Sequence, residues 1–242
     1  MTKRQITSNN LYWVRDNVIA NDFPDVSTAL TEPDGLLAIG GDLTPTRLLD
    51  AYRRGIFPWF SHGQPLLWWS PNPRWILKPD QLKISRSLRK TLRKNKFKVT
   101  YDQAFEKVVT SCAETRKDMA GTWITSEIKE NYQKLFTLGY AHSVECWHQD
   151  ELAGGLYGVA IGKIFFGESM FSRKSDASKV ALVHLVHLLN QLNFHIIDCQ
   201  VHSHHLESLG AVPIARETFT SLLSRYCLTR SQHHWPVKSD YS

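Results

Sequence analysis

Apolar residues beyond position 100 follow two different spacings along the chain. Helical spacing marks two segments, at about 105–112 and 126–138. Dense apolar runs then predict three consecutive strands, at His142–His148, Leu152–Ile161 and Ile164–Phe171. The Gly162-Lys163 pair suits a tight hairpin between the last two strands. We therefore expect the three strands to form an antiparallel meander.

The rest of this region alternates helices with short strands. The predicted elements are a helix at Ala177–Gln191, a strand at His195–Cys199, a short helix at His204–Leu209, a strand at Val212–Ile214 and a last helix from Glu217. Together with the meander they predict an α+β fold whose mixed sheet is flanked by helices. This layout is similar to that of the N-acyltransferase (GNAT-like) superfamily, a likeness of fold that says little about chemistry.

The first 75 residues follow a different, turn-rich pattern. A helix is expected to begin at Thr44-Pro45 and to end at Gly55. Beyond it, the aromatic residues lie among several prolines: Phe57, Trp59, Phe60, Trp68 and Trp69. We expect these prolines to exclude a central strand and a long helix, which leaves a rigid aromatic loop. The loop either covers a small aromatic core or forms a stacking platform for a base.

The change of pattern predicts two domains. Residues 1–75 would form a small N-terminal domain with the aromatic, proline-rich loop, and residues 76–242 an acyltransferase-like catalytic domain. A chain of 242 residues offers ample material for both cores.

Composition narrows the class of protein. Hydrophobic residues make up 42% and charged residues 21% of the chain, a balance that argues against disorder. The four cysteines are widely spaced without a CxxC pair, as in reduced cytoplasmic proteins. The first residues contain no apolar signal-peptide region, and no later apolar run is long enough to span a membrane. We expect a cytoplasmic protein without a membrane partner.

Positive charge is concentrated in one stretch of a chain whose formal net charge is +6. Between Gln81 and Tyr101 there is no acidic residue, whereas lysine and arginine recur throughout. Helical spacing of Leu88 and Leu92 predicts a helix over 85–94 with a narrow apolar edge. The helix is either an ordinary solvated face or a surface for a polyanion, and the absence of acids favours the second interpretation. No known sequence-specific DNA-binding motif is present.

Three polar residues interrupt the apolar strands. Glu168 lies within FFGESMFSR, residues 165–173, and Asp198 and Gln200 end the strand IIDCQ. The spacing of two predicts that Asp198 and Gln200 share a face, and a strand–helix–strand connection can bring them to Glu168. Buried acids of this kind mark functional sites. The alternative is structural, with Asp198 capping a turn and Glu168 pairing with a following cation at 173 or 174.

Several blocks together resemble one family: LLAIGGDL, RRGIFPWFS, LWWSPNPR, GTWIT, GLYGVAIG, FFGESMFSR, ASKVAL, IIDCQ and HLESLGA. Over about residues 30 to 220 the chain is similar to the bacterial leucyl/phenylalanyl-tRNA–protein transferases. The resemblance implies transfer of Leu or Phe, with Met as a further candidate, from aminoacyl-tRNA to the N-terminal Arg or Lys of an acceptor protein. The transferred residue marks that protein for N-end rule degradation. The resemblance implies a cytoplasmic enzyme without metal or cofactor.

The resemblance also implies roles for the polar residues. Asp198 and Gln200 would handle the attacking amine while Glu168 organises their network. Asp198 could act as a general base or as an anchor for the ammonium group, and both alternatives stay open. An apolar pocket for the transferred side chain would come from Leu156, Phe165, Met170 and Trp123.

The remaining implied contacts are with the tRNA. Residues expected around the aminoacyl-adenosine end are Tyr52, Trp59, Trp123 and Tyr132. The basic stretch would bind acceptor-stem phosphates through Arg86, Arg89, Arg93 and Lys94. Ser203 stands where the family commonly has Asn, a departure that puts any role of this position in amine binding in doubt.

Two rival functions were considered. An acetyl-CoA-dependent acetyltransferase needs a glycine-rich turn before the helix that follows the meander, and SRKSDASK has no glycine. A zinc protein is suggested by a group of possible ligands: His184, His187, Cys199, His202, His204 and His205. Their spacing matches no standard zinc site, which favours ordinary surface and core histidines.

Overall fold

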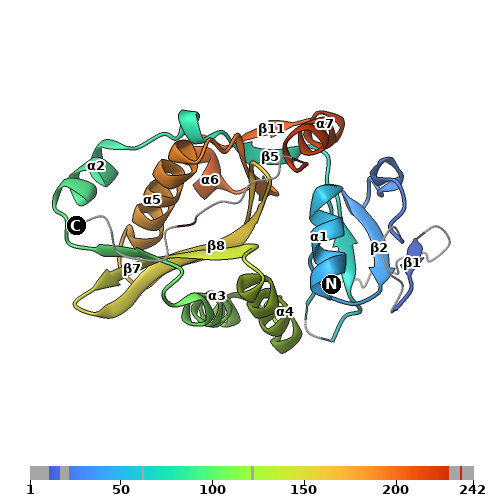
Figure 1. Ribbon diagram of the computed structural model, residues 1–242, viewed down its shortest axis with the longest axis horizontal. Coiled ribbons are helices and arrows are strands. Elements are labelled where there is room, and N and C mark those ends of the chain that lie inside the picture. The colour runs from blue at the N-terminus through green and yellow to red at the C-terminus, as the bar shows by residue number, and fades with distance from the viewer. Residues whose placement is uncertain (1–10, 17–21, 62, 121–122, 229–234, 236–242) are drawn as a thin grey trace.

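Two sheets organise the computed structural model, which describes residues 11–16, 22–61, 63–120, 123–228 and 235 (Figure 1). A four-stranded sheet has the order β1-β2-β4-β3, and a seven-stranded sheet has the order β11-β5-β10-β9-β8-β7-β6. The first sheet consists of β1 (Tyr12–Val14), β2 (Leu36–Gly40), β3 (Phe57–Pro58) and β4 (Leu67–Trp69). The second consists of β5 (Arg74–Leu77), β6 (Lys98–Tyr101), β7 (Ala141–His148), β8 (Glu151–Ile161), β9 (Ile164–Ser172), β10 (Ile196–Gln200) and β11 (Val212–Ile214).

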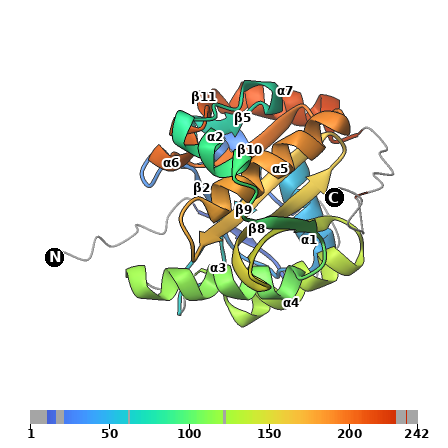
Figure 2. The ribbon, with the colours of Figure 1, turned by 90° about the vertical axis from the view of Figure 1, so that its left-hand side faces the viewer.

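Helices cover both faces of the second sheet. Their bounds are α1 (Pro45–Arg53), α2 (Arg86–Arg93), α3 (Phe105–Ala120), α4 (Ser126–Thr137), α5 (Ala177–Gln191), α6 (His204–Ser208) and α7 (Arg216–Tyr226), with short 3-10 turns at Val26–Thr28 and Pro79–Gln81. Helices α3 and α4 lie on one side of the sheet, whereas α5 and α2 lie on the other (Figure 2). Each face has its own apolar core, as an amphipathic helix on a two-sided sheet requires.

The predicted fold class is confirmed. Strands β7, β8 and β9 form the expected antiparallel meander, and the chain turns between the last two at Gly162 and Lys163. Helix α5 then connects β9 to β10, which pairs parallel to β9. The result is a mixed sheet flanked by helices. No helix in the described ranges is both long and apolar enough to cross a membrane.

The prediction that prolines exclude a central strand is wrong. Strand β4 lies between β2 and β3, and β5 lies between β11 and β10. The prolines at 65, 71 and 73 stand outside these short strands, and Pro58 lies in the edge strand β3, so no interior ladder loses its N–H donor. Trp68 is fully buried whereas Trp59 is 44% exposed, so the same stretch supplies both a core and a surface ring.

The division into domains at residue 75 stays a prediction. The first two residues of β5, Arg74 and Trp75, already pair within the second sheet.

Strand β2, within LLAIGGDL, and strand β6 were not predicted. Both are short and lack a clear alternation of apolar and polar residues.

Candidate active site

A cavity of about 250 Å³ lies where β8, β9 and β10 run side by side. Glu168, Asp198 and Gln200 line it, together with apolar side chains from the sheet and from α5. The register explains the convergence, because Asp198 pairs with Phe166 on the neighbouring parallel strand, two residues before Glu168. The structure thus brings the three polar residues together as the sequence predicted.

Glu168 is the most strongly perturbed acid of the site. Its Oε1 accepts hydrogen bonds from the Tyr52 hydroxyl at 2.7 Å and from Gln200 Nε2 at 2.9 Å, and its Oε2 accepts one from the Tyr132 hydroxyl at 2.9 Å. Only 8% of the residue is exposed. Burial raises the pKa of Glu168 to about 7, although the three donors oppose the shift. Near neutral pH this carboxyl can therefore hold or release a proton.

Tyr52 and Tyr132 hold the Glu168 carboxyl in place through their hydroxyls. Both tyrosines are fully buried, and their hydroxyls also lie within hydrogen-bonding distance of each other, so their two protons are shared between this contact and the bonds to Glu168. Burial is the main cause that raises the pKa of each hydroxyl well above its usual value. Neither residue lines the cavity, so their rings have no surface on which a ligand could stack. The predicted direct contact of these two rings with the adenosine end is therefore not available in this structure.

Asp198 is held by a residue that the sequence analysis missed. Arg74 of β5 donates from Nε to Oδ1 at 2.8 Å and from Nη2 to Oδ2 at 2.6 Å, and the two residues are 1% and 0% exposed. The guanidinium lies 4.7 Å from the ring centres of both Phe57 and Phe219 and donates to the Gly55 carbonyl at 3.2 Å. Both oxygens of Asp198 are thus engaged inside the protein.

One signal could have indicated Arg74. A fully buried carboxylate needs a cation, and Arg74 opens RWIL, the apolar strand that follows the prolines. The mistaken exclusion of a central strand hid this partner.

A bulge in β10 separates Gln200 from Asp198. The register with β5 shifts between these two residues, and Gln200 has a φ of +63°. The backbone N–H of Gln200 donates to Asp198 Oδ1 at 2.9 Å, while its side chain turns to Glu168. The alternative pairing of Glu168 is wrong, since Arg173 pairs with Glu114 instead. Asp198 does bond a nearby backbone N–H, as that alternative foresaw, but its main partner is Arg74.

The other predicted pocket residues do line the cavity: Trp59, Trp123, Leu156, Phe165, Met170 and Ser203. Leu156 of β8 and Met170 of β9 are cross-strand partners, which places them on the same face. Sequence reasoning did not assign Leu182 and Leu185 of α5 or Leu206 of α6 to the cavity, which they also line.

Helix α2 carries the predicted phosphate-binding residues on its surface. Arg86, Arg89, Arg93 and Lys94 are all exposed, and within the described part of the chain none of their side chains forms an ion pair. The helix is anchored by Leu88, which is 1% exposed, and by a 2.9 Å hydrogen bond from Thr91 to Asp176 at the start of α5. Its cations therefore face solvent.

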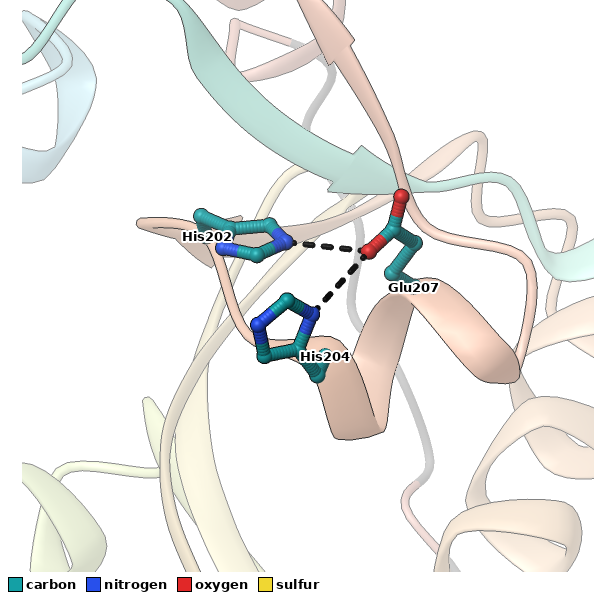
Figure 3. Close-up of side chains that lie close together, drawn as sticks. All are labelled: His202, His204 and Glu207. Atoms are coloured by element: carbon teal, nitrogen blue, oxygen red, sulfur yellow. Dashed lines mark hydrogen bonds and ion pairs between the residues drawn. The ribbon is translucent and has the colours of Figure 1, made fainter.

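The proposed zinc ligands separate into two places. His202 and His204 come together with Glu207, which was not predicted (Figure 3). His184 and His187 lie on α5, and neither Cys199 nor His205 joins the cluster. Burial raises the pKa of the Cys199 thiol far above its usual value, so this residue stays protonated at the cavity wall.

The antiparallel meander, the crossover helix α5 and the parallel strand β10 give the second sheet an N-acyltransferase-like layout, with a polar cluster beside an apolar cavity. Two family models match this chain: the leucyl/phenylalanyl-tRNA protein transferase model over residues 76–224 and the model of that family's N-terminal domain over residues 41–72. The chain belongs to the leucyl/phenylalanyl-tRNA–protein transferase family.

Curated relatives carry the same family name. The transferase of Azoarcus sp. (strain BH72) is 59% identical over 84% of this chain and 87% of its own. That of Aromatoleum aromaticum is 58% identical over 85% and 86%, and that of Chromohalobacter salexigens is 56% identical over 94% and 88%. Each of these matches covers 86–88% of the relative's own length.

Two solved structures are similar to this chain at low sequence identity. The L-PGS of Bacillus licheniformis superposes with a TM-score of 0.43 at 9% identity, over 80% of this chain and 73% of that chain. An aminoglycoside acetyltransferase from a soil metagenome, solved with sisomicin, has a TM-score of 0.38 at 13% identity, over 47% of this chain and 85% of that chain. Such remote likenesses carry no conclusion about activity.

Proposed function

We propose that the chain transfers Leu or Phe, with Met as a further candidate, from aminoacyl-tRNA to the N-terminal Arg or Lys of acceptor proteins in the cytoplasm. The transferred residue would mark the acceptor for N-end rule degradation. The observation that carries this proposal is a cavity that combines an apolar wall with the polar side chains of Glu168 and Gln200. The apolar wall suits the transferred Leu or Phe side chain, and the two polar residues suit the attacking amine.

The apolar wall suits the transferred side chain. Leu156, Phe165 and Met170 line the cavity from the sheet, and Leu182 and Leu185 line it from α5. Burying a Leu or Phe side chain there contributes roughly 1.5–3 kcal/mol of binding free energy. None of these five residues is charged, so a charged side chain would lose its hydration without gaining a partner from this wall.

Gln200 is suited to orient the attacking amine. Its Nε2 donates to Glu168, which leaves the amide oxygen as the acceptor for an N–H of the acceptor's α-amine. The negative charge of Glu168 polarises this amide and stabilises the positive charge that develops on the amine nitrogen. Held in this way, the nitrogen lone pair can be aimed at the ester carbon of the aminoacyl-tRNA.

The reaction balances without an added cofactor. The α-amine forms a C–N bond with the aminoacyl carbon, the ester C–O bond to the ribose breaks, and the nitrogen's proton ends on the released ribose hydroxyl. Glu168, with a pKa of about 7, is the cavity group best placed to hold that proton in transit. An α-amine has a pKa of about 8, so the transfer between them is nearly balanced.

Asp198 acts by positioning rather than as the base. Both of its oxygens accept from Arg74, and one also accepts from the Gln200 backbone. Replacing these partners with a substrate amine would leave the Arg74 guanidinium unpaired in the interior, which is strongly unfavourable. Asp198 therefore fixes the bulge from which Gln200 reaches Glu168.

The tRNA would be held at its end and along its backbone. Trp59 is 44% exposed, lines the cavity and packs against Trp69 at 5.7 Å between ring centres, so its free face can stack on the terminal adenine. The α2 cations would bind acceptor-stem phosphates, a contact indifferent to sequence. Ser203 lines the cavity without a capping bond to α6, which leaves its hydroxyl for the acceptor's backbone.

The start of α5 argues against acetyl-CoA as the acyl donor. Asp176 occupies the N-cap position, where its carboxylate accepts from Thr91 and pairs with Lys179. A pyrophosphate at this helix start would meet a negative charge instead of a glycine-rich turn.

A transfer assay tests the proposal. The protein is incubated with leucyl-tRNA and a peptide with N-terminal Arg, and mass spectrometry should detect Leu-Arg at the peptide's N-terminus. The same peptide with an acetylated N-terminus, and acetyl-CoA in place of leucyl-tRNA, should give no product. Acetylation of the peptide, or equal transfer to a peptide with N-terminal Asp, would overturn the proposed function.

A further inference from the structure

Three metal-binding side chains meet beside the active-site cavity. His202 follows β10, while His204 and Glu207 lie one turn apart on α6 (Figure 3). Glu207 Oε2 is 3.0 Å from His202 Nε2 and 3.6 Å from His204 Nδ1. All three ligand atoms lie within 4.8 Å of one another.

These separations suit a shared ion. Zinc binds imidazole nitrogen and carboxylate oxygen at about 2.0–2.1 Å, so neighbouring ligands of a tetrahedral ion are roughly 3.3 Å apart. The two distances to Glu207, 3.0 and 3.6 Å, lie on either side of that value, and the two histidine nitrogens are within 4.8 Å of each other. An ion at the centre would replace the hydrogen bond between His202 and Glu207 and the 3.6 Å contact between His204 and Glu207.

One ring of the cluster is held in place by packing, and the other two side chains are exposed enough to adjust to an ion. The His202 ring packs against Trp75 with 4.5 Å between ring centres, which limits its rotation. The His204 side chain is 94% exposed, so it can rotate to bring its Nδ1 closer to Glu207 Oε2 than the present 3.6 Å. The Glu207 side chain is 52% exposed, so a water molecule can reach a fourth coordination position.

We propose that His202 Nε2, His204 Nδ1 and Glu207 bind a divalent transition-metal ion, with Zn²⁺ the best match to two imidazoles and a carboxylate. The proposal does not depend on the transfer reaction, which needs no metal. Ser203 and His205 alternate with the ligands and line the cavity. A bound ion would therefore restrain segment 202–207 at the edge of the active site.

Metal titration of the full chain, purified without a histidine tag, tests the proposal. After removal of metals by a chelator, Zn²⁺ is titrated by calorimetry and Co²⁺ by visible absorption. We expect one site that His204→Ala or Glu207→Gln weakens by at least tenfold. His187→Ala, an exposed histidine on α5, is the matched control and should bind Zn²⁺ as the unaltered chain does.

Two further measurements keep the result decisive. A variant without His233 and His234, which lie outside the described residues, should retain the site. Hydrogen exchange of segment 202–207 should slow on adding Zn²⁺ in the unaltered chain but not in His204→Ala, whose melting temperature without metal should be unchanged. If the unaltered chain binds no Zn²⁺, or His204→Ala and Glu207→Gln bind it as tightly, the three side chains form an ordinary hydrogen-bonded cluster and the proposal is wrong.

Discussion

Glu168 shows how a single residue can be unfavourable for the fold and useful for chemistry. Its carboxyl is buried between two tyrosine hydroxyls and an amide, and its pKa rises to about 7 from an ordinary 4.5. Between these two pH values the folded chain binds more protons at this group than the unfolded chain does. The free energy of unfolding must therefore fall as the pH rises through this window, and the full penalty is present above pH 7.

Glu168→Gln should remove this pH dependence. Relative to the variant, the unaltered chain should lose on the order of 3 kcal/mol of unfolding free energy between pH 4.5 and pH 7.5. Urea unfolding at several pH values measures the difference. Glu106→Gln, an exposed acid on α3, is the control and should show no such trend. Parallel stability curves for Glu168→Gln and the unaltered chain would show that the carboxyl titrates normally.

Arg74 and Asp198, unlike Glu168, form a buried ion pair, and each charge is tolerated in the interior only while the other is present. Arg74→Met should lower the free energy of unfolding by about 3–5 kcal/mol, because the Asp198 carboxylate would stay buried without its partner. In urea unfolding, Arg74→Met combined with Asp198→Leu should recover most of the lost free energy of unfolding. Aminoacyl transfer should be abolished in both the single and the double variant. A double variant as unstable as the single one would mean that the pair is not the main source of the effect.

At the scale of elements, the β8–β9 hairpin sets the shape of the pocket. Leu156 and Met170 face each other across these strands and line the cavity. Met170→Trp should therefore reduce transfer of Phe more than transfer of Leu, since the larger ring needs the space that the indole fills. Misplacing one such contact changes the activation free energy by roughly 1–3 kcal/mol.

The ratio of Phe to Leu transfer is the measurement for this variant. Leu138→Trp introduces the same ring directly after α4, at a residue that is 58% exposed and outside the cavity, and should leave the ratio unchanged. Equal losses for Phe and Leu with Met170→Trp would place the side-chain pocket elsewhere.

Helix α2 is proposed to bind tRNA phosphates through its surface charge, while its packing only anchors it. Replacing Arg86, Arg89, Arg93 and Lys94 by Gln should weaken tRNA binding while the anchor Leu88 keeps the fold. Each lost phosphate contact should reduce the slope of log affinity against log salt concentration by about 0.9 for duplex-like binding.

The control for α2 removes cations elsewhere. Lys107→Gln with Arg225→Gln changes two exposed residues on α3 and α7, and the salt slope should stay the same. If the α2 variant also keeps its slope, the helix is an ordinary solvated face.

At the scale of the whole molecule, the two parts of the chain meet at the candidate active site. Tyr52 from α1, a helix next to the first sheet, donates to Glu168 on the second, and Arg74 donates to the Gly55 carbonyl just after α1 (Figure 1). Tyr132 completes the cluster from α4. The active-site carboxylate is thus held by both parts of the chain at once.

Tyr52→Phe and Tyr132→Phe should therefore be energetically coupled. In a double-mutant cycle of unfolding free energies, the coupling between them should be about 0.5–3 kcal/mol, because their hydroxyls share Glu168 and bond each other. A cycle that pairs Tyr52→Phe with Tyr140→Phe is the control, since no hydrogen bond joins that pair among the described residues. Additive losses for Tyr52 and Tyr132 would contradict a shared network.

The sequence by itself determined the helices α1 to α7, the strands from β7 onward and the presence of the acids. Apolar runs specify β8 and β9, and the turn residues on either side of β8 set the limits of the meander that includes β7. Glu168, Asp198 and Gln200 were visible because polar residues stand out in such runs. Two of the blocks that resemble the family, GLYGVAIG and FFGESMFSR, coincide with β8 and β9.

Only the tertiary structure decided what holds these residues. The partners of Glu168 and Asp198 lie more than thirty residues away in the chain, at Tyr52, Tyr132 and Arg74. The bulge that separates Asp198 from Gln200 arises from pairing with β5, a strand that the local prolines concealed. Burial and pairing are properties of the packed chain, and local spacing carries no record of which distant side chain will satisfy a buried charge.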